Sequence, residues 1–430
     1  MKIAYIGGCG RLGSAMAAHT AACGCTVYIA DLNETAVQAM REGRFCSNEP
    51  QVSDLLKECD FFLSTDTAWV AAEAELIRVV VPTPSMPSGR FSSRHVEEAC
   101  REIAKGLVDS KHEYPVVEIV STVMPGDTEG PILEALESTG LEAGKDFGLV
   151  YSPEFVRQGS IIKDFSDPDV ILIGEFDKRS GDAVEQFYFS ILKQPTHPAA
   201  STIHHMSILN AEIAKLVLNV AVTTKAALAN QIAMYCHMVP GADAREVLGA
   251  VGDDSRIGRR YFSPGAWVTG PCFPRDLSAL IAAMQSLAPV HIVFAVELFN
   301  NCSMPRVIAN WVAAECPRDA NVGILGLAFK PGVDITAESQ GVFLADELEC
   351  RGYAVCTHDP MARDPRSWRQ VGTLLDMVYL NSFLVIMTPW EQYFDLAQMD
   401  LEGKTVYDMW GLFNDNELEC DRYIRFGRGT

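Results

Sequence analysis

Short apolar runs alternate with amphipathic stretches through the N-terminal part of the chain. This alternation predicts a parallel sheet with helices wound on both faces. The predicted helices lie at about 34–42, 68–75 and 94–108, and the predicted strands at 3–6, 26–30, 76–81, 116–120 and 170–174, with one more starting near 147. A second, shorter alternation near the C-terminus predicts strands at 321–325, 354–358, 383–387 and 405–407. The chain therefore carries the pattern of two α/β sheets.

The segment between these patterns is helical. Residues 203–238 contain no proline, are rich in alanine and keep helical periodicity, so they predict one long helix of about 50 Å. Further helices are predicted at 244–250 and 276–300. The expected architecture is two Rossmann-like, doubly wound parallel-sheet domains joined by a central helical domain. Its expected boundaries are 1–202, 203–302 and 303–430.

One face of the predicted long helix is polar. Glu212, Lys215, Asn219 and Thr223 fall at positions i, i+3, i+7 and i+11, while the other faces are almost wholly apolar. Such a stripe faces either a ligand cavity or solvent. The apolar remainder of the helix favours the cavity, because buried polar groups need partners.

The first predicted strand runs into a glycine-rich turn. Gly8, Gly10 and Gly13 form a G-x-G-x-x-G before a helix of small residues, and Asp31 ends the next strand. Glycines at these positions let a pyrophosphate approach the backbone and the helix N-terminus, and the acid can bind the adenosine ribose. Asp31 would repel a 2′-phosphate. This favours NAD over NADP as the cofactor.

Polar residues follow several other strands. Pro82 and Thr83 follow one, and Ser121 and Thr122 follow the next, where they would face the nicotinamide half of the cofactor. Ordinary turn chemistry explains these residues equally well. Glu154, after a proline at a strand end, suits a general base, with a solvated loop acid as the alternative.

A loop rich in glycine and proline, residues 263–276, carries Cys272 four residues before Asp276. Pro271 and Pro274 stiffen the backbone on either side of the thiol, so Cys272 is a candidate nucleophile. A packed loop with an incidental thiol is the alternative. The nearby cluster Arg256, Arg259 and Arg260 suggests a phosphate-bearing substrate.

Composition narrows the function. The 430 residues are 48% hydrophobic and 21% charged, as in a soluble globular protein, and the net charge of -21 argues against nucleic acid and anionic membranes as partners. No apolar run is expected to approach membrane-spanning length. The first residues are expected to form a strand directly. Thirteen cysteines without framework or metal-site spacing indicate reduced thiols and no metal. The expected location is the cytoplasm.

Taken together, these motifs resemble the UDP-glucose/GDP-mannose (nucleotide-sugar) 6-dehydrogenase family. The resemblance covers essentially the whole chain, from the glycine turn through Pro153-Glu154-Phe155 and Cys272-Phe273-Pro274-Arg275-Asp276 to Gly326-Leu327-Ala328-Phe329-Lys330-Pro331. It implies the four-electron oxidation of a sugar C6 alcohol to a carboxylate with two NAD. The predicted long helix could also serve as a dimer interface, so a homodimer formed through it is expected.

The resemblance assigns roles to matched residues. Cys272 would be the nucleophile, Lys215 and Asn219 would stabilise an oxyanion, Asp276 and Thr122 would orient a water, and Glu154 would assist hydrolysis. The expected cofactor-binding residues are Gly8, Gly10, Arg11, Leu12, Gly13, Asp31, Pro82, Thr83, Ser121 and Thr122. The expected substrate-binding residues are Phe155, Arg157, Lys215, Asn219, Arg256, Tyr261, Gly270, Phe329 and Lys330, with Arg256 reaching the substrate of a neighbouring subunit.

Three residues depart from the family pattern on the substrate side. Thr269 replaces a glycine, Gln158 replaces an acid and Ala337 replaces an arginine. These departures suggest retained chemistry on an unusual substrate. Two alternatives stay open: a two-electron hydroxyacid or alcohol dehydrogenase using Lys215 and Asn219, and a catalytically inactive nucleotide-binding homologue.

Overall fold

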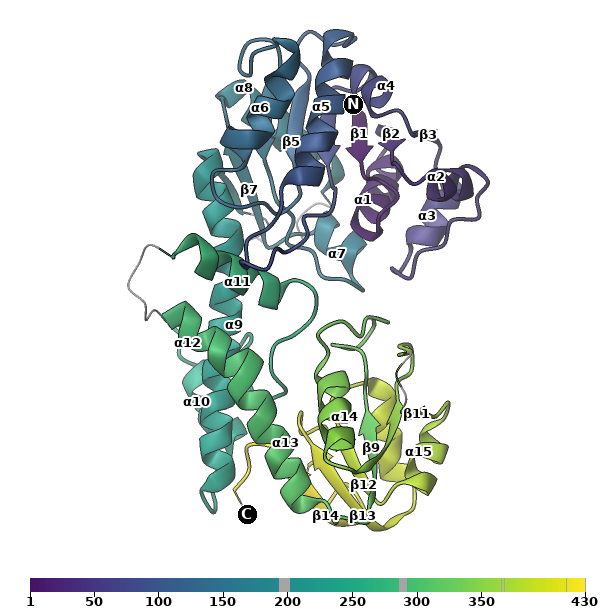
Figure 1. The fold of residues 1–430 in the computed structure, drawn as a ribbon, viewed down its shortest axis with the longest axis vertical. Coiled ribbons are helices and arrows are strands. Elements are labelled where there is room, and N and C mark those ends of the chain that lie inside the picture. The colour runs from purple at the N-terminus through teal and green to yellow at the C-terminus, as the bar shows by residue number, and fades with distance from the viewer. Residues whose placement is uncertain (193–201, 286–291, 365, 367, 415, 430) are drawn as a thin grey trace. The chain divides into compact units, whose positions relative to one another are not determined.

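The computed structural model describes residues 1–192, 202–285, 292–364, 366, 368–414 and 416–429. The chain divides into two units, Met1–Val217 and Leu218–Thr430. Each unit is built around one sheet (Figure 1). The division falls inside a helix, and the three domain boundaries expected from the sequence stay a prediction.

The first unit contains an eight-stranded sheet in the order β3-β2-β1-β4-β5-β6-β7-β8. Neighbouring strands are parallel except β6 and β7, which are antiparallel. The order 3-2-1-4-5-6 is that of a dinucleotide-binding sheet, with its switch point between β1 and β4. The strands are β1 (Lys2–Ile6), β2 (Thr26–Ala30), β3 (Phe61–Ser64), β4 (Leu76–Val79), β5 (Val116–Ile119), β6 (Gly148–Tyr151), β7 (Val170–Glu175) and β8 (Thr202–Met206).

Helices cover both faces of this sheet. Ile3 and Tyr5 belong to one buried cluster and Ala4 and Ile6 to another, so successive residues of β1 point into cores on opposite faces. The helices are α1 (Arg11–Ala22), α2 (Glu34–Arg41), α3 (Val52–Glu58), α4 (Thr67–Glu73), α5 (Arg94–Val108), η1 (Thr128–Ile132), α6 (Leu133–Leu136), η2 (Glu137–Thr139), α7 (Ile161–Ser166) and α8 (Lys178–Ile191).

The long helix α9 (Ile208–Met238) starts in the first unit and continues in the second. The sequence analysis placed its start at 203, which is wrong. Residues 203–206 belong to strand β8, where Ile203 pairs with Ile171 of β7. Tertiary pairing with an existing sheet edge outweighs the helical periodicity of these few residues.

The second unit contains an all-parallel sheet in the order β11-β10-β9-β12-β13-β14. Its helices are α10 (Ala244–Gly252), α11 (Phe273–Ala283), α12 (Ile292–Leu298), η3 (Phe299–Ser303), α13 (Met304–Glu315), α14 (Gln340–Cys350), α15 (Leu374–Leu380) and η4 (Glu391–Gln398). Its strands are β9 (Asn321–Leu325), β10 (Ala354–His358), β11 (Arg369–Gln370), β12 (Phe383–Ile386), β13 (Leu401–Asp408) and β14 (Cys420–Arg425). The two-sheet α/β architecture predicted from the sequence is confirmed.

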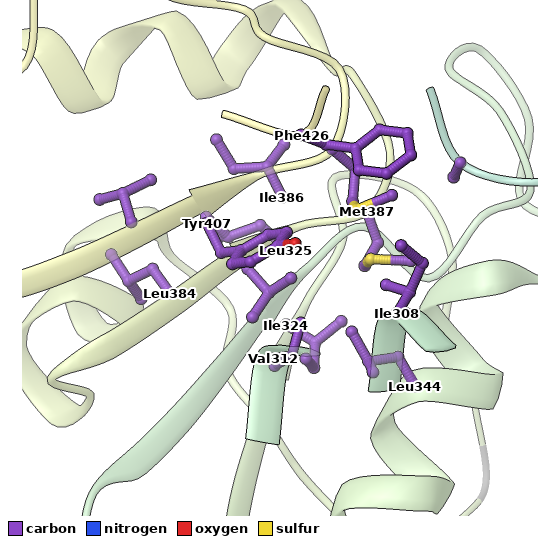
Figure 2. Close-up of a cluster of buried hydrophobic side chains, with 14 of the residues drawn as sticks. Ile308, Val312, Ile324, Leu325, Leu344, Leu384, Ile386, Met387, Tyr407 and Phe426 are labelled. Atoms are coloured by element: carbon purple, nitrogen blue, oxygen red, sulfur yellow. The ribbon is translucent and has the colours of Figure 1, made fainter. Parts of the chain in front are cut away.

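The core of the second unit lies between this sheet and the helices beside it. Figure 2 shows Ile324 of the central strand β9 near Val312 of α13 and Leu344 of α14. The stretch expected as a helix over 276–300 contains α11 and α12, and residues 286–291 between them lie outside the described part of the chain.

Two helical segments are long and apolar enough to span a membrane by length and composition alone. They are Ile208–Met238 and Ile292–Glu315. The expectation that no segment reaches this length is therefore wrong. In α9 the apolar residues share the helix with a buried polar face, whose Glu212, Lys215 and Asn219 all have hydrogen-bond partners in the folded chain.

Candidate active site

The turn between β1 and α1 is closely packed. Gly7 has a φ of 82°, and a Cβ atom on Gly13 would lie 2.6 Å from the Gly7 carbonyl oxygen. Gly10 is the N-cap of α1, and as a glycine it makes no side-chain capping bond. A helix N-terminus of this kind suits an anionic ligand.

Asp31 follows β2 beside this turn. Its Oδ2 accepts from the Cys9 N–H at 3.0 Å and its Oδ1 from the Asn33 N–H at 2.9 Å. The carboxylate thus ties the glycine turn to the end of β2. Arg11, the first residue of α1, lies 3.7 Å from the buried carboxylate of Glu49.

The loops after β4 and β5 are joined by a hydrogen bond. The Ser121 hydroxyl donates to the Val81 carbonyl at 2.7 Å, and Thr83 is buried next to this point. Thr122 is half-buried and Pro82 is exposed. The four polar-loop residues expected from the sequence therefore lie at neighbouring strand ends, beside the switch point of the sheet.

Glu154 and Lys215 come together in the first unit. The Lys215 ammonium donates to the Glu154 backbone carbonyl at 2.6 Å and lies 4.4 Å from the centroid of the Phe155 ring. The Glu154 carboxylate accepts from Arg78 at 2.9 Å. Arg157, three residues further on, is exposed and pairs with Asp164.

The polar face of α9 is buried, as the sequence predicted. Glu212, which is 0% exposed, accepts from the backbone N–H groups of Gly126 at 2.6 Å and Thr128 at 2.9 Å. Burial raises the pKa of Glu212 above its ordinary value, although these bonds act in the opposite direction. Asn219 donates to Asp276 at 2.5 Å, and Thr223 donates to the Asn219 carbonyl. The face thus anchors the loop carrying Thr122 and the helix carrying Asp276.

Cys272 is exposed at the N-cap of α11. The Asp276 N–H donates to its carbonyl at 2.9 Å, so residues 273–276 form the first helical turn. They do not form a loop, as the sequence analysis expected, because Pro274 fits the first turn of a helix. The thiol and the Asn219–Asp276 pair are therefore one turn apart in the second unit.

Two buried asparagines hold the backbone before Cys272. Asn300 accepts from the Val268 N–H at 2.9 Å and donates to the Val268 carbonyl at 2.7 Å. Asn230 of α9 makes the same pair of bonds to Gly265 and Ala266. The loop is therefore fixed by side chains from two helical segments.

Other expected substrate residues are spread over the second unit. Gly270, with a φ of 87°, faces Phe329, whose ring would lie 2.6 Å from an added Cβ. Lys330 follows, 5.9 Å from the Phe329 ring centroid. Arg256 is exposed and paired with Asp254, and Tyr261 is exposed. Arg259 pairs with Asp253, so neighbouring acids balance two of the three arginines expected to bind phosphate.

Three family models match successive parts of the chain. They describe the NAD binding domain (residues 1–192), the central domain (209–302) and the UDP binding domain (323–415) of the UDP-glucose/GDP-mannose dehydrogenase family. A GDP-mannose 6-dehydrogenase of Pseudomonas syringae pv. tomato is 30% identical over 445 residues, covering 98% of this chain and 99% of that one. The chain belongs to the UDP-glucose/GDP-mannose dehydrogenase family.

Two further relatives agree with this assignment. A UDP-glucose 6-dehydrogenase of Haloferax volcanii is 29% identical over 381 residues, covering 85% of this chain and 84% of that one. The structure of a UDP-glucose dehydrogenase from Pyrobaculum islandicum matches with a TM-score of 0.88 and 31% identity, covering 99% of this chain and 98% of that one. This dehydrogenase is an NAD-dependent oxidoreductase.

The acids that follow the two glycine turns of the dehydrogenase differ in exposure. Asp31 is half-buried, whereas Asp359, at the matching end of β10, is buried and accepts from the N–H groups of Leu327 and Ala328, both at 2.8 Å. The glycine turn before α1 and the accessible Asp31 fit a dinucleotide. The NAD binding domain model matches this first unit.

The dehydrogenase's three departures from the family pattern have different surroundings. Thr269 is buried, and its hydroxyl has no hydrogen-bond partner among the described residues. The Gln158 side-chain oxygen is likewise buried without a partner there. Ala337 is exposed.

The sequence analysis missed the buried side chains that fix Glu154 and the backbone before Cys272 in place. Arg78 and Glu118 form a fully buried ion pair between β4 and β5, and Arg78 also reaches Glu154. A signal was present, because opposite charges interrupt two apolar runs predicted as neighbouring buried strands. The clamp by Asn300 had no such signal.

Proposed function

We propose that the dehydrogenase oxidises the C6 primary alcohol of a nucleotide sugar, UDP-glucose or a close analogue, to the uronic acid. The observation that carries this proposal is the exposed Cys272 thiol at the N-terminus of α11, one turn from the buried Asn219–Asp276 pair. The relatives named GDP-mannose and UDP-glucose 6-dehydrogenases support the substrate class.

The proposed reaction is a four-electron oxidation. Bound NAD⁺ supplies the hydride acceptor, and two NAD⁺ are consumed in turn. The first oxidation converts the alcohol to an aldehyde with loss of a proton. Cys272 Sγ then bonds to the aldehyde carbon, and loss of a second hydride leaves a thioester. Water adds to the acyl carbon, the C–S bond breaks, and the thiolate and the carboxylate are released. The overall products are one carboxylate, two NADH and three protons.

The chain's own residues would support these steps in the roles given by the resemblance. The Lys215 ammonium and the Asn219 amide stabilise the oxyanion, since charged and polar donors aimed at developing charge lower the barrier. Thr122 and Asp276 orient a water, and Glu154 takes the proton of the hydrolytic water. Phe155, Arg157, Tyr261, Gly270, Phe329 and Lys330 contact the substrate.

A homodimer would complete this site, because Arg256 is proposed to reach the substrate of the partner copy. The support is the exposed apolar surface of α9, where Leu228, Tyr235 and Met238 are each at least half exposed. Sedimentation of the purified protein tests this proposal. A monomer at catalytic concentration would exclude it.

Counting NADH decides the function. UDP-glucose, GDP-mannose and other nucleotide sugars are screened for NADH formation, and the active one should yield two NADH per molecule consumed. Cys272→Ser should keep NAD affinity and lose the second oxidation, whereas Cys350→Ser, at another exposed cysteine, should behave as wild type.

Other results would point to the alternatives. One NADH per substrate, with an aldehyde or ketone accumulating, would establish a two-electron dehydrogenase. NAD binding without turnover of any nucleotide sugar would indicate an inactive homologue. Full turnover by Cys272→Ser would remove the thiol from the reaction.

A further inference from the structure

A guanidinium is buried inside the first sheet. Arg78 lies on β4 among apolar residues and is 0% exposed. Its Cζ lies 4.7 to 5.6 Å from the ring centroids of Tyr5, Phe165, Phe187 and Tyr188. A buried cation is tolerated only when its charge and its N–H donors are matched, so its partners show what it does.

Arg78 serves two carboxylates. Its Nε and Nη2 donate to Glu118 at 2.7 and 2.8 Å, across a register pair of β4 and β5. Its Nη2 also donates to Glu154 Oε1 at 2.9 Å. Glu118 alone would neutralise the buried guanidinium of Arg78. The hydrogen bond from Arg78 to Glu154 is therefore not needed to compensate for burial of the cation.

Glu154 is held through one oxygen. Its Oε1 accepts from Arg78 and from the Tyr188 hydroxyl, the latter at 3.0 Å. Within the described part of the chain, Oε2 receives no hydrogen bond. The charged and titratable groups facing Glu154 are Arg78 of β4, Glu118 of β5, Tyr188 of α8 and Lys215 of α9. The carboxylate therefore has a fixed orientation and one oxygen to spare.

We propose that Arg78 is a positioning residue for the hydrolytic step, acting through Glu154. This rests on the proposed function. Arg78 and Tyr188 hold Oε1, and Oε2 takes the proton of the attacking water. The water oxygen bonds to the acyl carbon, and the electron pair of the broken C–S bond returns to Cys272 Sγ. Without Arg78, Oε1 would lose one of its two donors and the carboxylate would no longer be held in this orientation.

Two tyrosines offer a matched test. The hydroxyls of Tyr5 and Tyr188 both accept from Arg78, at 3.2 and 3.1 Å, and both side chains are buried. Tyr188 alone of the two also reaches Glu154. Tyr188→Phe should therefore slow hydrolysis about tenfold, whereas Tyr5→Phe should stay within about twofold of wild type.

Rapid-mixing kinetics of NADH formation separate hydrolysis from the oxidations, with whichever of UDP-glucose and GDP-mannose turns over faster as substrate. Tyr188→Phe should show a burst of two NADH per site followed by a slow steady rate, because the thioester accumulates. The double variant Arg78→Met/Glu118→Gln, which removes both buried charges, should show the same burst. Unchanged NAD affinity and a cooperative thermal melt establish that each variant is folded.

The outcomes are distinct. Equal kinetics of the two tyrosine variants, or wild-type hydrolysis by a folded double variant, would overturn the positioning role while leaving the proposed function intact. If the double variant does not fold, the tyrosine pair decides. One NADH per substrate from the wild type would instead defeat the proposed function itself.

Discussion

Replacing Asn300 with alanine should loosen the loop that carries Cys272. Asn300 is 1% exposed and bonds both the N–H and the carbonyl of Val268, four residues before the thiol. Alanine removes both bonds and offers no substitute, so two half-buried backbone groups lose their partners. The other asparagine, Asn230, would still hold the loop, but it binds Gly265 and Ala266, which are further from Cys272.

The size of the effect follows from these two bonds. A neutral hydrogen bond contributes about 0.5–1.5 kcal/mol net, and an unsatisfied buried group costs about 1–3 kcal/mol. Since water can reach part of Val268, we expect a loss of about 2–3 kcal/mol in the free energy of unfolding. For a unit of this size that corresponds to a Tm about 5–10 °C lower. Loss of position at the thiol should lower kcat about tenfold or more.

Three measurements test this prediction: Tm from thermal melts, kcat from NADH formation, and NAD affinity from calorimetry. NAD affinity should not change, because the cofactor-binding turn lies in the other unit. Asn210→Ala, at an exposed position of α9, is the control and should leave Tm and kcat near wild type. A variant Asn300→Ala with Tm within about 1 °C and kcat within about twofold of wild type would refute the reasoning.

Two further predictions concern the cofactor turn and pH. Gly13→Ala should weaken NAD binding about tenfold or more, since its Cβ would lie 2.6 Å from a backbone oxygen; calorimetry that finds wild-type affinity would contradict this. Burial lowers the pKa of His237 below its ordinary value. Below about pH 6.5 this histidine is therefore protonated more readily in the unfolded chain than in the folded chain, and the free energy of unfolding falls as the pH drops. His237→Phe should therefore reduce the Tm difference between about pH 7.5 and about pH 5.5, and an unchanged difference would exclude His237 as its source.

Local patterns predicted much of the fold. The apolar runs and the Gly8–Gly13 turn placed both sheets, because buried parallel strands and their glycine turns have signatures within a few residues. The start of α9 was missed because β8 forms only by pairing with β7. The antiparallel step between β6 and β7 likewise depends on contacts that no local pattern encodes.

The candidate site divides in the same way. Spacing along one helix predicted the buried face with Glu212, Lys215 and Asn219, because helical geometry is local. The bond of Asn300 to Val268 spans 32 residues, and that of Arg78 to Glu118 spans 40. Partners this far apart in the sequence are brought together only by the fold. The sequence alone therefore showed a charged residue within an apolar strand, such as Arg78, but not its partner.

The buried Asp359 has a consequence for interpreting other sequences. Both sheets of this enzyme have a glycine turn after the first strand and an acid after the second, and in both the acid accepts from N–H groups of its own turn. A search that counts such pairs would assign the chain two dinucleotide pockets. The two acids differ in exposure, because Asp31 is half-buried whereas Asp359 is 1% exposed. An adenosine ribose can therefore be bound only where the carboxylate stays within reach of a ligand.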